Sequence, residues 1–428
     1  MLAHAIFGAE ATYGRWLSNV APMTDLIGWL CVIMLLLMSL LVLYQWTLAV
    51  VSFLPRHRGK ISNGRDALRF VILIPAHNEQ STLPRTLESL DQLRYPKERV
   101  DVVVIADRCD DATAVVARSR GCHCLERSNG PPGKGAAIAW SINELRKESV
   151  PFDALVMIDA DTVVDAGLLE AFNEGLRSGR QIQQAYNYIS NPWDTPFTRI
   201  IAVTSIMRNG LFYTGKSQLG LAGMLMGTGM CLGRQVIERY GWTAFSVGED
   251  WEFSVLLLLA GEMIYFNPMA RVLATESSGF KDAWTQRLRW ASGRHAVAAS
   301  GAWELLLTGL RQRRVYLVDA ALTLLAPNYS SQAALAVFAL IISWFLSGYP
   351  AWRFPLPWAA LVMTSLAAYF LLGVALTQSP LRALAGIALI PLFVPWRMTI
   401  EVMGLLGYGR KQWHRTPRLP PSRQRPPT

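Results

Sequence analysis

Three acidic groups and one basic, aromatic segment are the parts of this sequence whose residue types and spacing could do chemistry. In chain order they are Asp107, the pair Asp159 and Asp161, the pair Glu249 and Asp250, and the segment Gln-Arg-Leu-Arg-Trp at 286–290. Carboxylates can hold a hard divalent cation or take a proton from a hydroxyl, and an arginine can bind a phosphate. The set therefore favours transfer of a group from a phosphorylated donor.

The acidic residues follow predicted β-strands. Apolar runs predict strands at 68–75, 102–106, 121–125 and 154–158, and helical patterns predict helices at 81–93, 111–120 and 135–148. This order predicts a mainly parallel sheet with helices on both faces. In such sheets ligands bind beyond the carboxyl ends of the strands. The acids that follow strand ends are Glu79, Asp107, Asp159 and Asp161.

Asp159 and Asp161 lie two residues apart with a small residue between them. Their oxygens could bind one Mg²⁺ or Mn²⁺, and such a cation can also bridge diphosphate oxygens. Alternatively, the pair is a helix cap and a surface acid. Asp107 could accept hydrogen bonds from a base or a ribose, and Asp111 is expected to be the N-cap of the following helix.

A glycine-rich turn at 130–135 contains Lys134 and leads directly into a predicted helix. Backbone amides at a helix start attract anions, and Lys134 adds a positive charge, although the turn could also be merely flexible. Further along, Glu249 and Asp250 precede an apolar run. Asp250 could serve as general base on a hydroxyl, or the two acids could simply interact with a helix dipole.

Gln286, Arg289 and Trp290 are spaced to share one face of a helix. Such a helix could bind a phosphate group with Arg289. It could also lie in the membrane interface with its arginines extended towards water. The two interpretations are compatible, because a surface helix can also close an active site.

The composition points to a membrane. Hydrophobic residues make up 52% of the chain and charged residues 17%. This composition is more apolar than that of an ordinary soluble protein. The net charge is +10. Basic residues gather beside apolar runs, which favours binding to an anionic membrane surface. The absence of base-reading motifs argues against binding to nucleic acid.

The spacing of the five cysteines does not predict disulfide bonds, and free thiols fit a reducing compartment. Cys122 and Cys124 are expected to pack in the protein rather than bind zinc.

The uncharged run at 26–54 is long enough to span a bilayer. Basic residues follow it, so the positive-inside rule places 1–25 outside the cell membrane and the domain at 55–280 in the cytoplasm. The remaining segments are predicted as interfacial helices at 281–326, spans at 328–348 and 357–378, a re-entrant or interfacial helix at 383–408, and a basic disordered tail at 409–428. A fourth span is the alternative for 383–408, and Tyr349, Trp352 and Trp358 are expected at the interface.

The ordered motifs resemble one known family. They are Pro75–Glu79, Asp107, Lys134–Gly135, Asp159–Asp161, Glu249–Asp250 and Gln286–Trp290. This set resembles the membrane-bound family 2 glycosyltransferases, which include cellulose, chitin and hyaluronan synthases, bacterial exopolysaccharide transferases and ceramide glucosyltransferases. The resemblance implies an α/β nucleotide-sugar-binding domain of the GT-A type, flanked by transmembrane helices, and an inverting single displacement.

The resemblance also implies roles for individual residues. Glu79, Asp107, Lys134 and Asp159 would contact the nucleotide, Asp161 would bind Mg²⁺ or Mn²⁺, and Asp250 would be the catalytic base. Gln286, Arg289 and Trp290 would hold the diphosphate and the acceptor. Gly227, Thr228 and Gly229 resemble the loop that lines the acceptor entrance.

The expected activity is transfer of a sugar from a UDP-sugar to a growing polysaccharide or a membrane-associated acceptor, in exopolysaccharide synthesis. The alternatives are transfer of one sugar to a lipid such as a ceramide, hopanoid or polyprenyl phosphate, and an inactive scaffold of an export complex. The expected location is the inner (cytoplasmic) membrane, as a multi-pass protein in contact with membrane lipids. Three spans are a narrow basis for a polymer channel, so a homo-oligomer or an export partner could complete one.

Overall fold

The computed structural model describes residues 2–55 and 67–409, so the basic segment at 56–65 and the predicted tail beyond Gly409 lie outside the described residues. The chain forms two compact units. One comprises the residues up to Trp46 together with Pro327–Leu372, and the other comprises Thr47–Ala326 together with the chain from Gly373.

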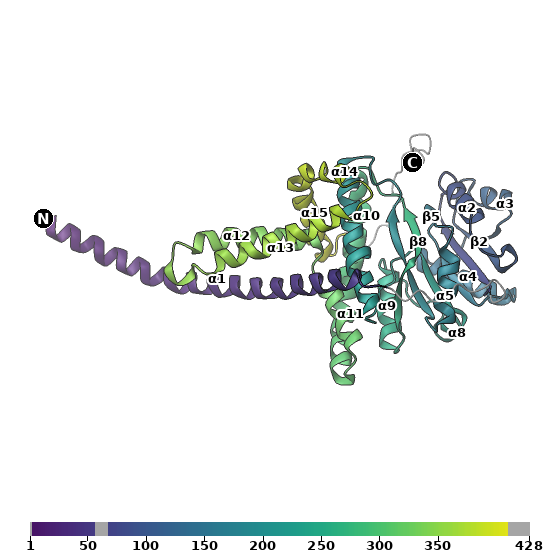
Figure 1. Cartoon of the computed structure of the whole chain (residues 1–428), viewed down its shortest axis with the longest axis horizontal. Helices are drawn as coiled ribbons and strands as arrows, with labels where there is room; N and C mark the ends of the chain where they lie inside the picture. The colour runs from purple at the N-terminus through teal and green to yellow at the C-terminus, as the bar shows by residue number, and fades with distance from the viewer. Residues whose placement is uncertain (1, 56–66, 410–428) are drawn as a thin grey trace. The chain divides into compact units, whose positions relative to one another are not determined.

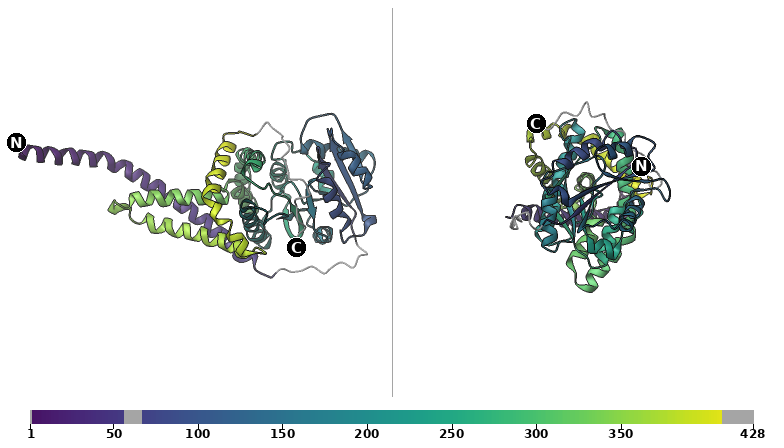
Figure 2. Two further views of the ribbon diagram at one scale, coloured as in Figure 1. Left: turned by 90° about the horizontal axis from the view of Figure 1, so that it is seen from above. Right: turned by 90° about the vertical axis from the view of Figure 1, so that its right-hand side faces the viewer.

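The first unit is built from apolar helices. Its helices are α1 (Leu2–Ser52) as far as Trp46, α12 (Tyr329–Leu346), the short η3 (Pro350–Trp352) and α13 (Pro355–Ala375) as far as Leu372. They run side by side (Figures 1 and 2) and are joined by polar contacts, with Gln45 donating to Gln332 at 2.9 Å and Trp358 to Ser39 at 2.8 Å. Such contacts are the usual way for apolar helices to fix their register when surrounded by hydrocarbon.

Two details of this unit add to the sequence-based expectations. The indole of Trp352, expected at the interface, is packed within the protein and donates to the Asp25 carboxylate at 2.9 Å. Helix α1 begins at Leu2, and its part that is apolar enough to cross a membrane begins at Pro22. The start of the uncharged run marks where a helix becomes apolar enough to cross a bilayer, which is a different point from where the helix begins.

Four helical segments of the described residues are long and apolar enough to cross a membrane. They are Pro22–Ser52, Tyr329–Leu346, Pro350–Ala375 and Pro380–Leu405. The first three overlap the segments that were predicted as spans. The fourth consists of α14 (Pro380–Leu384), η4 (Ile387–Leu389) and α15 (Ile390–Leu405), and it is longer than the apolar segment from which the re-entrant helix was predicted.

An eight-stranded sheet forms the centre of the second unit. Its strands are β1 (Phe70–Ala76), β2 (Val100–Asp107), β3 (His123–Arg127), β4 (Ala154–Met157), β5 (Thr162–Val164), β6 (Ile182–Ile189), β7 (Met230–Gly233) and β8 (Ile264–Ala274), in the order β3-β2-β1-β4-β7-β6-β8-β5. The four strands from β3 to β4 are parallel, as predicted. Beyond β4 the sheet is mixed, because β7 pairs antiparallel with both of its neighbours and β5 pairs antiparallel with β8.

Helices cover both faces of this sheet, as the predicted three-layer arrangement requires (Figure 1). The covering helices are α2 (Leu83–Asp91), α3 (Thr113–Ser119), α4 (Lys134–Lys147), α5 (Leu168–Arg177), α8 (Arg234–Tyr240) and α9 (Glu249–Leu259). Side chains of β1 alternate between the two faces: Phe70 and Ile72 pack with α2 and α5, whereas Val71 and Leu73 pack with α4 and α9. This period of two is the expected property of a strand buried on both sides.

Further helices extend this unit beyond the sheet. They are α6 (Pro196–Ser205), the π-helical η2 (Ile206–Tyr213), α7 (Thr214–Gln218), α10 (Phe280–Gln312) and α11 (Val315–Leu325). Helix α10 packs against α9, α11 and α15. The segment predicted as interfacial helices at 281–326 is therefore two helices, α10 and α11, attached to the sheet through α9.

A fully buried ion pair fastens α11 to the rest of the unit. The ammonium of Lys216, on α7, lies 2.8 Å from the Asp319 carboxylate and donates to the Thr323 hydroxyl at 2.8 Å. Lys216 is completely inaccessible to solvent. Its burial lowers its pKa, while Asp319 acts in the opposite direction.

Breaking this pair is expected to destabilise the second unit. Lys216→Met leaves Asp319 as a buried charge without its counterion, which costs about 3–5 kcal/mol. The thermal unfolding midpoint of the detergent-solubilised protein should fall. Lys216→Met combined with Asp319→Leu should recover most of the loss, and a double variant as unstable as the single one would contradict the assignment.

Candidate active site

The parallel strands bring their carboxyl ends to one edge of the sheet. Ala76 lies opposite Ala106, so β1 and β2 finish together, and β4 finishes opposite Leu73, three residues before the end of β1, at the same edge of the sheet. Segments that are far apart in the chain therefore meet here; for example, the His77 ring nitrogen Nδ1 lies 2.7 Å from the backbone oxygen of Asp107. This edge is where ligands bind in sheets of this kind.

Lys134 joins several acidic groups at this edge. It is the first residue of α4, and its ammonium donates to the Asp159 carboxylate and, at 2.6 Å, to the backbone oxygen of Gly227. Burial alone would lower the pKa of Lys134, but the carboxylates of Asp159 and Glu249 outweigh burial and raise it. Lys134 therefore stays charged and partly neutralises the acids around it.

Two glycines bring the acidic start of α9 against α10. A β-carbon on Gly293 would lie 3.0 Å from the backbone nitrogen of Gly248, so the two backbones touch. Gly248 is the N-cap of α9, directly before Glu249 and Asp250. Arg289 lies one helical turn before Gly293 on α10. Its charge interacts with Glu249, Asp159 and Asp250, although burial is the larger influence and lowers its pKa.

Asp250 has a strongly altered acidity. Burial is the main cause, and the neighbouring charge of Glu249 adds to it, so the pKa of Asp250 rises to about 7. One of its carboxylate oxygens accepts the backbone amide of Trp251 at 2.9 Å. A carboxylate with a pKa near neutrality is suited to take a proton from a hydroxyl.

The segment 227–229 is held against the same carboxylates. Gly227 and Gly229 have φ angles of +81° and +68°, which favour glycine. The hydroxyl of Thr228 accepts the backbone amide of Asp159 at 3.1 Å. Gln184, which the sequence did not single out, is fully buried and donates to the Thr228 backbone oxygen at 2.9 Å. The loop and Asp159 therefore form one connected structure.

Sequence and structure comparisons relate this chain to known proteins. The family model described as "Glycosyltransferase like family 2" matches residues 68–293, more than half of the chain. The chain belongs to glycosyltransferase family 2. The matched region contains Glu79, Asp107, Lys134, the Asp159 to Asp161 pair, Asp250 and the segment at 286–290.

Curated relatives of this glycosyltransferase have different named products. It is 27% identical over 241 residues to "Probable glycosyltransferase YdaM" of Bacillus subtilis and 25% identical over 249 residues to the poly-beta-1,6-N-acetyl-D-glucosamine synthase of Staphylococcus epidermidis. Both matches cover 55% of this chain and 57% of the relative. It is also 25% identical over 304 residues to the beta-monoglucosyldiacylglycerol synthase of Trichormus variabilis, covering 68% of this chain and 62% of that protein.

A solved structure shares the fold. The mannosyltransferase PcManGT from Pyrobaculum calidifontis, solved in complex with GDP-Man and Mn²⁺, superimposes with a TM-score of 0.56 over 90% of this chain and 97% of that one. At 16% identity this likeness shows the fold alone. The glycosyltransferase has the GT-A type of nucleotide-sugar-binding fold.

Two residues that were predicted to contact the nucleotide, Asp107 and Glu79, accept hydrogen bonds from other side chains of the glycosyltransferase. Both carboxylate oxygens of Asp107 accept hydrogen bonds, from Arg127 at 2.6 Å and from Arg108 at 2.7 Å. Glu79 accepts a hydrogen bond from the Thr82 hydroxyl. Arg127 was not predicted, because it lies on the next strand and reaches Asp107 only once β3 has paired with β2.

The predicted N-cap at Asp111 is wrong by one position. Helix α3 begins at Thr113 and its N-cap is Ala112. Asp111 nevertheless accepts the backbone amide of Thr113 at 2.9 Å, so it still holds the first turn of the helix. The structural role predicted for Asp111 is retained through a turn that starts one residue earlier.

The residues beside Asp161 fit a cation that is shared with a substrate. Asp161 is partly buried and lies between β4 and β5, two residues after Asp159. Among residues 2–55 and 67–409 no group of three or more His, Cys, Asp or Glu side chains is placed to hold a metal. One or two carboxylates completed by phosphate oxygens are the usual ligands of Mg²⁺ in nucleotide sites.

Gln286 and Trp290 lie on α10 with Arg289, as predicted. Trp290 is 44% exposed, and the guanidinium of Arg287 lies 5.2 Å from the centre of its ring. Arg287 is ion-paired with Glu276. The predicted face of α10 therefore contains an exposed aromatic ring beside the arginine whose charge interacts with the acids.

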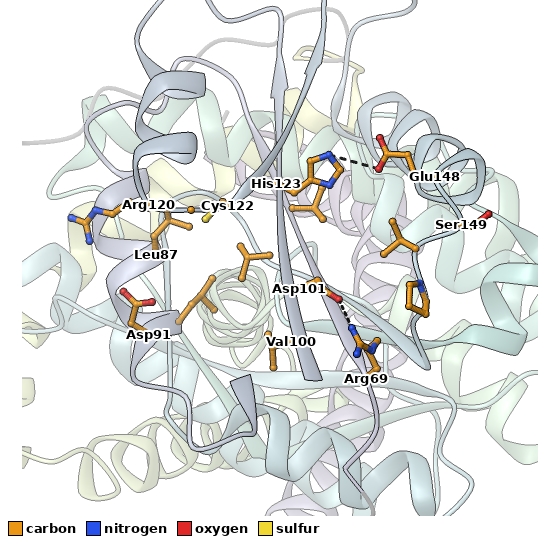
Figure 3. A pocket seen from close by; sticks show the side chains of 16 residues that line it. Arg69, Leu87, Asp91, Val100, Asp101, Arg120, Cys122, His123, Glu148 and Ser149 are labelled. Carbon is orange, nitrogen blue, oxygen red and sulfur yellow. Dashed lines mark hydrogen bonds and ion pairs between the residues drawn. The ribbon is translucent and has the colours of Figure 1, made fainter. Parts of the chain in front are cut away.

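A separate cavity lies at the opposite edge of the sheet. It has a volume of about 520 Å³ and is lined by the first residues of β2 and β3 and by the residues before β1 and β4 (Figure 3). Its charged side chains pair with each other, as Arg69 does with Asp101 and His123 with Glu148. Because these four charges are already paired, this cavity is a poor candidate for a site that binds a charged substrate.

The contact between Gly248 and Gly293 can be tested by substitution. Gly293→Ala should force α9 and α10 apart and move Arg289 relative to Asp250, and a displacement of about 1 Å can cost about 10²-fold in rate. Gly279→Ala is the matched control, because a β-carbon there meets nothing within 4 Å. Sugar-transfer rates at saturating donor should separate the two variants. Equal rates would contradict this role of the glycine contact.

The acidity of Asp250 predicts a pH profile. If Asp250 is the base, it acts only when deprotonated, so kcat/KM for the donor should rise with pH through about 7, the pKa of Asp250, and then level off. Glu249→Gln removes one cause of the raised pKa, so the midpoint of the rise should move to lower pH. A midpoint unchanged in Glu249→Gln would show that another group controls the profile.

Proposed function

We propose that this glycosyltransferase transfers a sugar from a UDP-sugar, with inversion, to a growing polysaccharide or another membrane-associated acceptor in exopolysaccharide synthesis. The observation that carries the proposal is the cluster in which Lys134 and Arg289 meet Asp159, Glu249 and Asp250. The likeness to a poly-beta-1,6-N-acetyl-D-glucosamine synthase supports a polysaccharide product.

In the proposed reaction Asp250 removes the proton from the acceptor hydroxyl as the oxygen attacks the anomeric carbon. The bond from that carbon to the diphosphate breaks, and the electron pair leaves with the UDP. Arg289 stabilises the charge that develops on the diphosphate, as a fixed positive group in a partly dry site can do. A Mg²⁺ or Mn²⁺ held by Asp161 would supply further positive charge to the same diphosphate oxygens.

Binding of the donor is assigned to the edge formed by β1, β2 and β4. Glu79, Asp107 and Asp159 would contact the nucleotide, with Lys134 near its phosphates. The pairing of Asp107 with the partly exposed Arg108 suggests that a ribose or base competes with Arg108 for that carboxylate. The acceptor would enter past Gly227, Thr228 and Gly229.

The remaining face of α10 completes the proposed site. Gln286 and Trp290 would contact the acceptor and the diphosphate, next to Arg289. The exposed ring of Trp290 is suited to stacking on a sugar, because an aromatic face buries the apolar face of the ring without a large entropic cost.

For the membrane we propose three spans, with the active site in the cytoplasm and the protein in the inner membrane. The fourth apolar segment is proposed to be re-entrant or interfacial. Its helix α15 packs along α10, and its Glu401 accepts hydrogen bonds from Arg294 at 2.7 Å and His295 at 3.0 Å. A homo-oligomer or an export partner would complete a polymer channel.

A second candidate activity is transfer of a single sugar to a lipid. It is favoured by a shallow groove of about 400 Å³ between α10 and α15, lined by Phe280, Lys281, Trp284 and Trp396. The likeness to a beta-monoglucosyldiacylglycerol synthase also supports it. An inactive scaffold is disfavoured, because a scaffold has no need for a partly buried Asp250 beside Lys134 and Arg289.

The test is release of UDP by the purified protein in lipid nanodiscs, across a panel of UDP-sugars with Mg²⁺ or Mn²⁺ and with EDTA. Asp250→Asn should lower sugar-specific release by about 10²–10⁴-fold, the usual contribution of a general base. Asp101→Asn is the matched control, since this carboxylate lies at the amino end of β2. EDTA should abolish release.

Sizing of the labelled product distinguishes the two candidate activities. A long product indicates a polysaccharide synthase, and a product with one added sugar indicates a lipid transferase. Release that Asp250→Asn leaves intact would contradict the proposed base, and the absence of release from every UDP-sugar would contradict the proposed donor.

A further inference from the structure

A group of arginines beside α10 contains more positive charge than the acids around it. The group consists of Arg208, Arg287, Arg294 and Arg397 with the acids Glu276 and Glu401. Glu276 pairs with Arg287, and Glu401 lies 2.7 Å from Arg294 and 2.6 Å from Arg397. Four arginines against two glutamates leave two positive charges without a counterion in this group.

Arg208 is the arginine without a partner. Within the described parts of the chain its guanidinium forms no hydrogen bond or ion pair. It lies on the π-helical η2, and π-helical turns occur often at functional sites. Its side chain reaches solvent, yet burial by the surrounding protein lowers its pKa. A charged group that is both accessible and partly desolvated can bind an incoming anion strongly.

Two neighbouring arginines also have unused donors. Nε of Arg287 and Nη1 of Arg397 are buried and have no hydrogen-bond acceptor. An unsatisfied buried donor costs about 1–3 kcal/mol. A phosphate has several acceptor oxygens and a negative charge. It could therefore accept hydrogen bonds from these donors and also neutralise the excess positive charge.

The apolar groove is on the same side of α10 as these arginines. Phe280, Trp284 and Arg287 are spaced at i, i+4 and i+7, which places them on one face of the helix. The rings of Phe280 and Trp396 meet at 5.1 Å, and with Trp284 they line the groove. An apolar chain in the groove would therefore end close to the arginines.

Helix α10 leads from the groove and the arginines towards Asp250. Phe280, Trp284 and Arg287 lie in its first turns, and Gly293 further along touches Gly248, which directly precedes Glu249 and Asp250. The groove, the arginines and the acidic start of α9 therefore follow one another along α10.

We propose that the acceptor is a lipid in which a phosphate joins an apolar chain to a hydroxyl-bearing sugar. The chain lies in the groove, the phosphate binds Arg208, Arg287 and Arg397, and the sugar hydroxyl reaches Asp250. The proposal rests on the proposed function, since Asp250 must be the base there. A neutral lipid would leave the excess charge uncompensated, and a free polysaccharide would leave the groove empty.

With this acceptor, the same bonds form and break as in the proposed reaction. The acceptor hydroxyl forms the new bond to the anomeric carbon and gives its proton to Asp250, while UDP leaves with the electron pair. The phosphate of the lipid is bound and is not consumed, so no further reactant is needed.

Binding of simple probes tests the charge recognition. The full-length protein in phosphatidylcholine nanodiscs is titrated with radiolabelled farnesyl phosphate, farnesol and inorganic phosphate. Farnesyl phosphate should bind about tenfold more tightly than farnesol, as one charge-assisted hydrogen bond can provide. Arg208→Gln should remove this preference, while the exposed control Arg118→Gln should keep it. Trp284→Ala should weaken both prenyl probes equally.

A pair of matched acceptors tests transfer. Both have a farnesyl chain and a terminal glucose, and only one has a phosphate between them. The phosphate-linked acceptor should be used with about tenfold higher kcat/KM, and Arg208→Gln should abolish the difference while leaving UDP binding intact.

Several outcomes would overturn the proposal. These are equal binding of farnesyl phosphate and farnesol, competition by inorganic phosphate as strong as that by farnesyl phosphate, and equal use of the two acceptors. Loss of farnesyl phosphate binding in phosphatidylglycerol nanodiscs would identify a site for bulk anionic lipid instead. Absence of UDP binding by the unaltered protein would contradict the proposed function, and the probe titrations would still report on the arginines.

Discussion

The rest of the site depends on the attraction between the ammonium of Lys134 and the carboxylates around it. Asp159 follows β4, whereas the consecutive Glu249 and Asp250 begin α9, and the three acids meet in a partly buried place where like charges repel strongly. A pair of unit charges 4 Å apart is worth about 4 kcal/mol at an effective dielectric constant of 20. Lys134 and Arg289 offset most of this repulsion, and the remainder is expressed in the raised pKa of Asp250. The same balance that makes the fold possible therefore leaves a carboxylate ready to accept a proton.

Backbone geometry decides which charges can meet. The parallel register of β1, β2 and β4 places Asp107 and Asp159 at one edge, and the contact of Gly248 with Gly293 brings α9 and α10 together. Since α10 also packs on α15, one helix connects the acids of the site to a segment apolar enough for a membrane. With the proposed base and the apolar groove both next to this one helix, an acceptor could stay in the membrane while it reacts, as the proposed function requires.

The parts of the fold that were predictable are those with strong local patterns. The apolar runs behind Asp107 and Asp159 became β2 and β4 within two residues of their predicted ends, because buried strands are encoded by a few consecutive residues. The mixed half of the sheet was missed, since β5 and β7 have only three and four residues and their pairing is decided by distant partners. Arg127 and Gln184 were missed for the same reason. Arg208 was missed because nothing in its neighbours along the chain distinguishes an unpaired arginine from a solvated one.

The most direct test of this account is the anomeric configuration of the newly formed linkage, measured by NMR on the product of a donor of known configuration. A single displacement with Asp250 as base predicts inversion at the anomeric carbon. Retention of configuration would require a covalent intermediate or another route through the same residues, and it would contradict the assignment of Asp250 as the base that activates the acceptor.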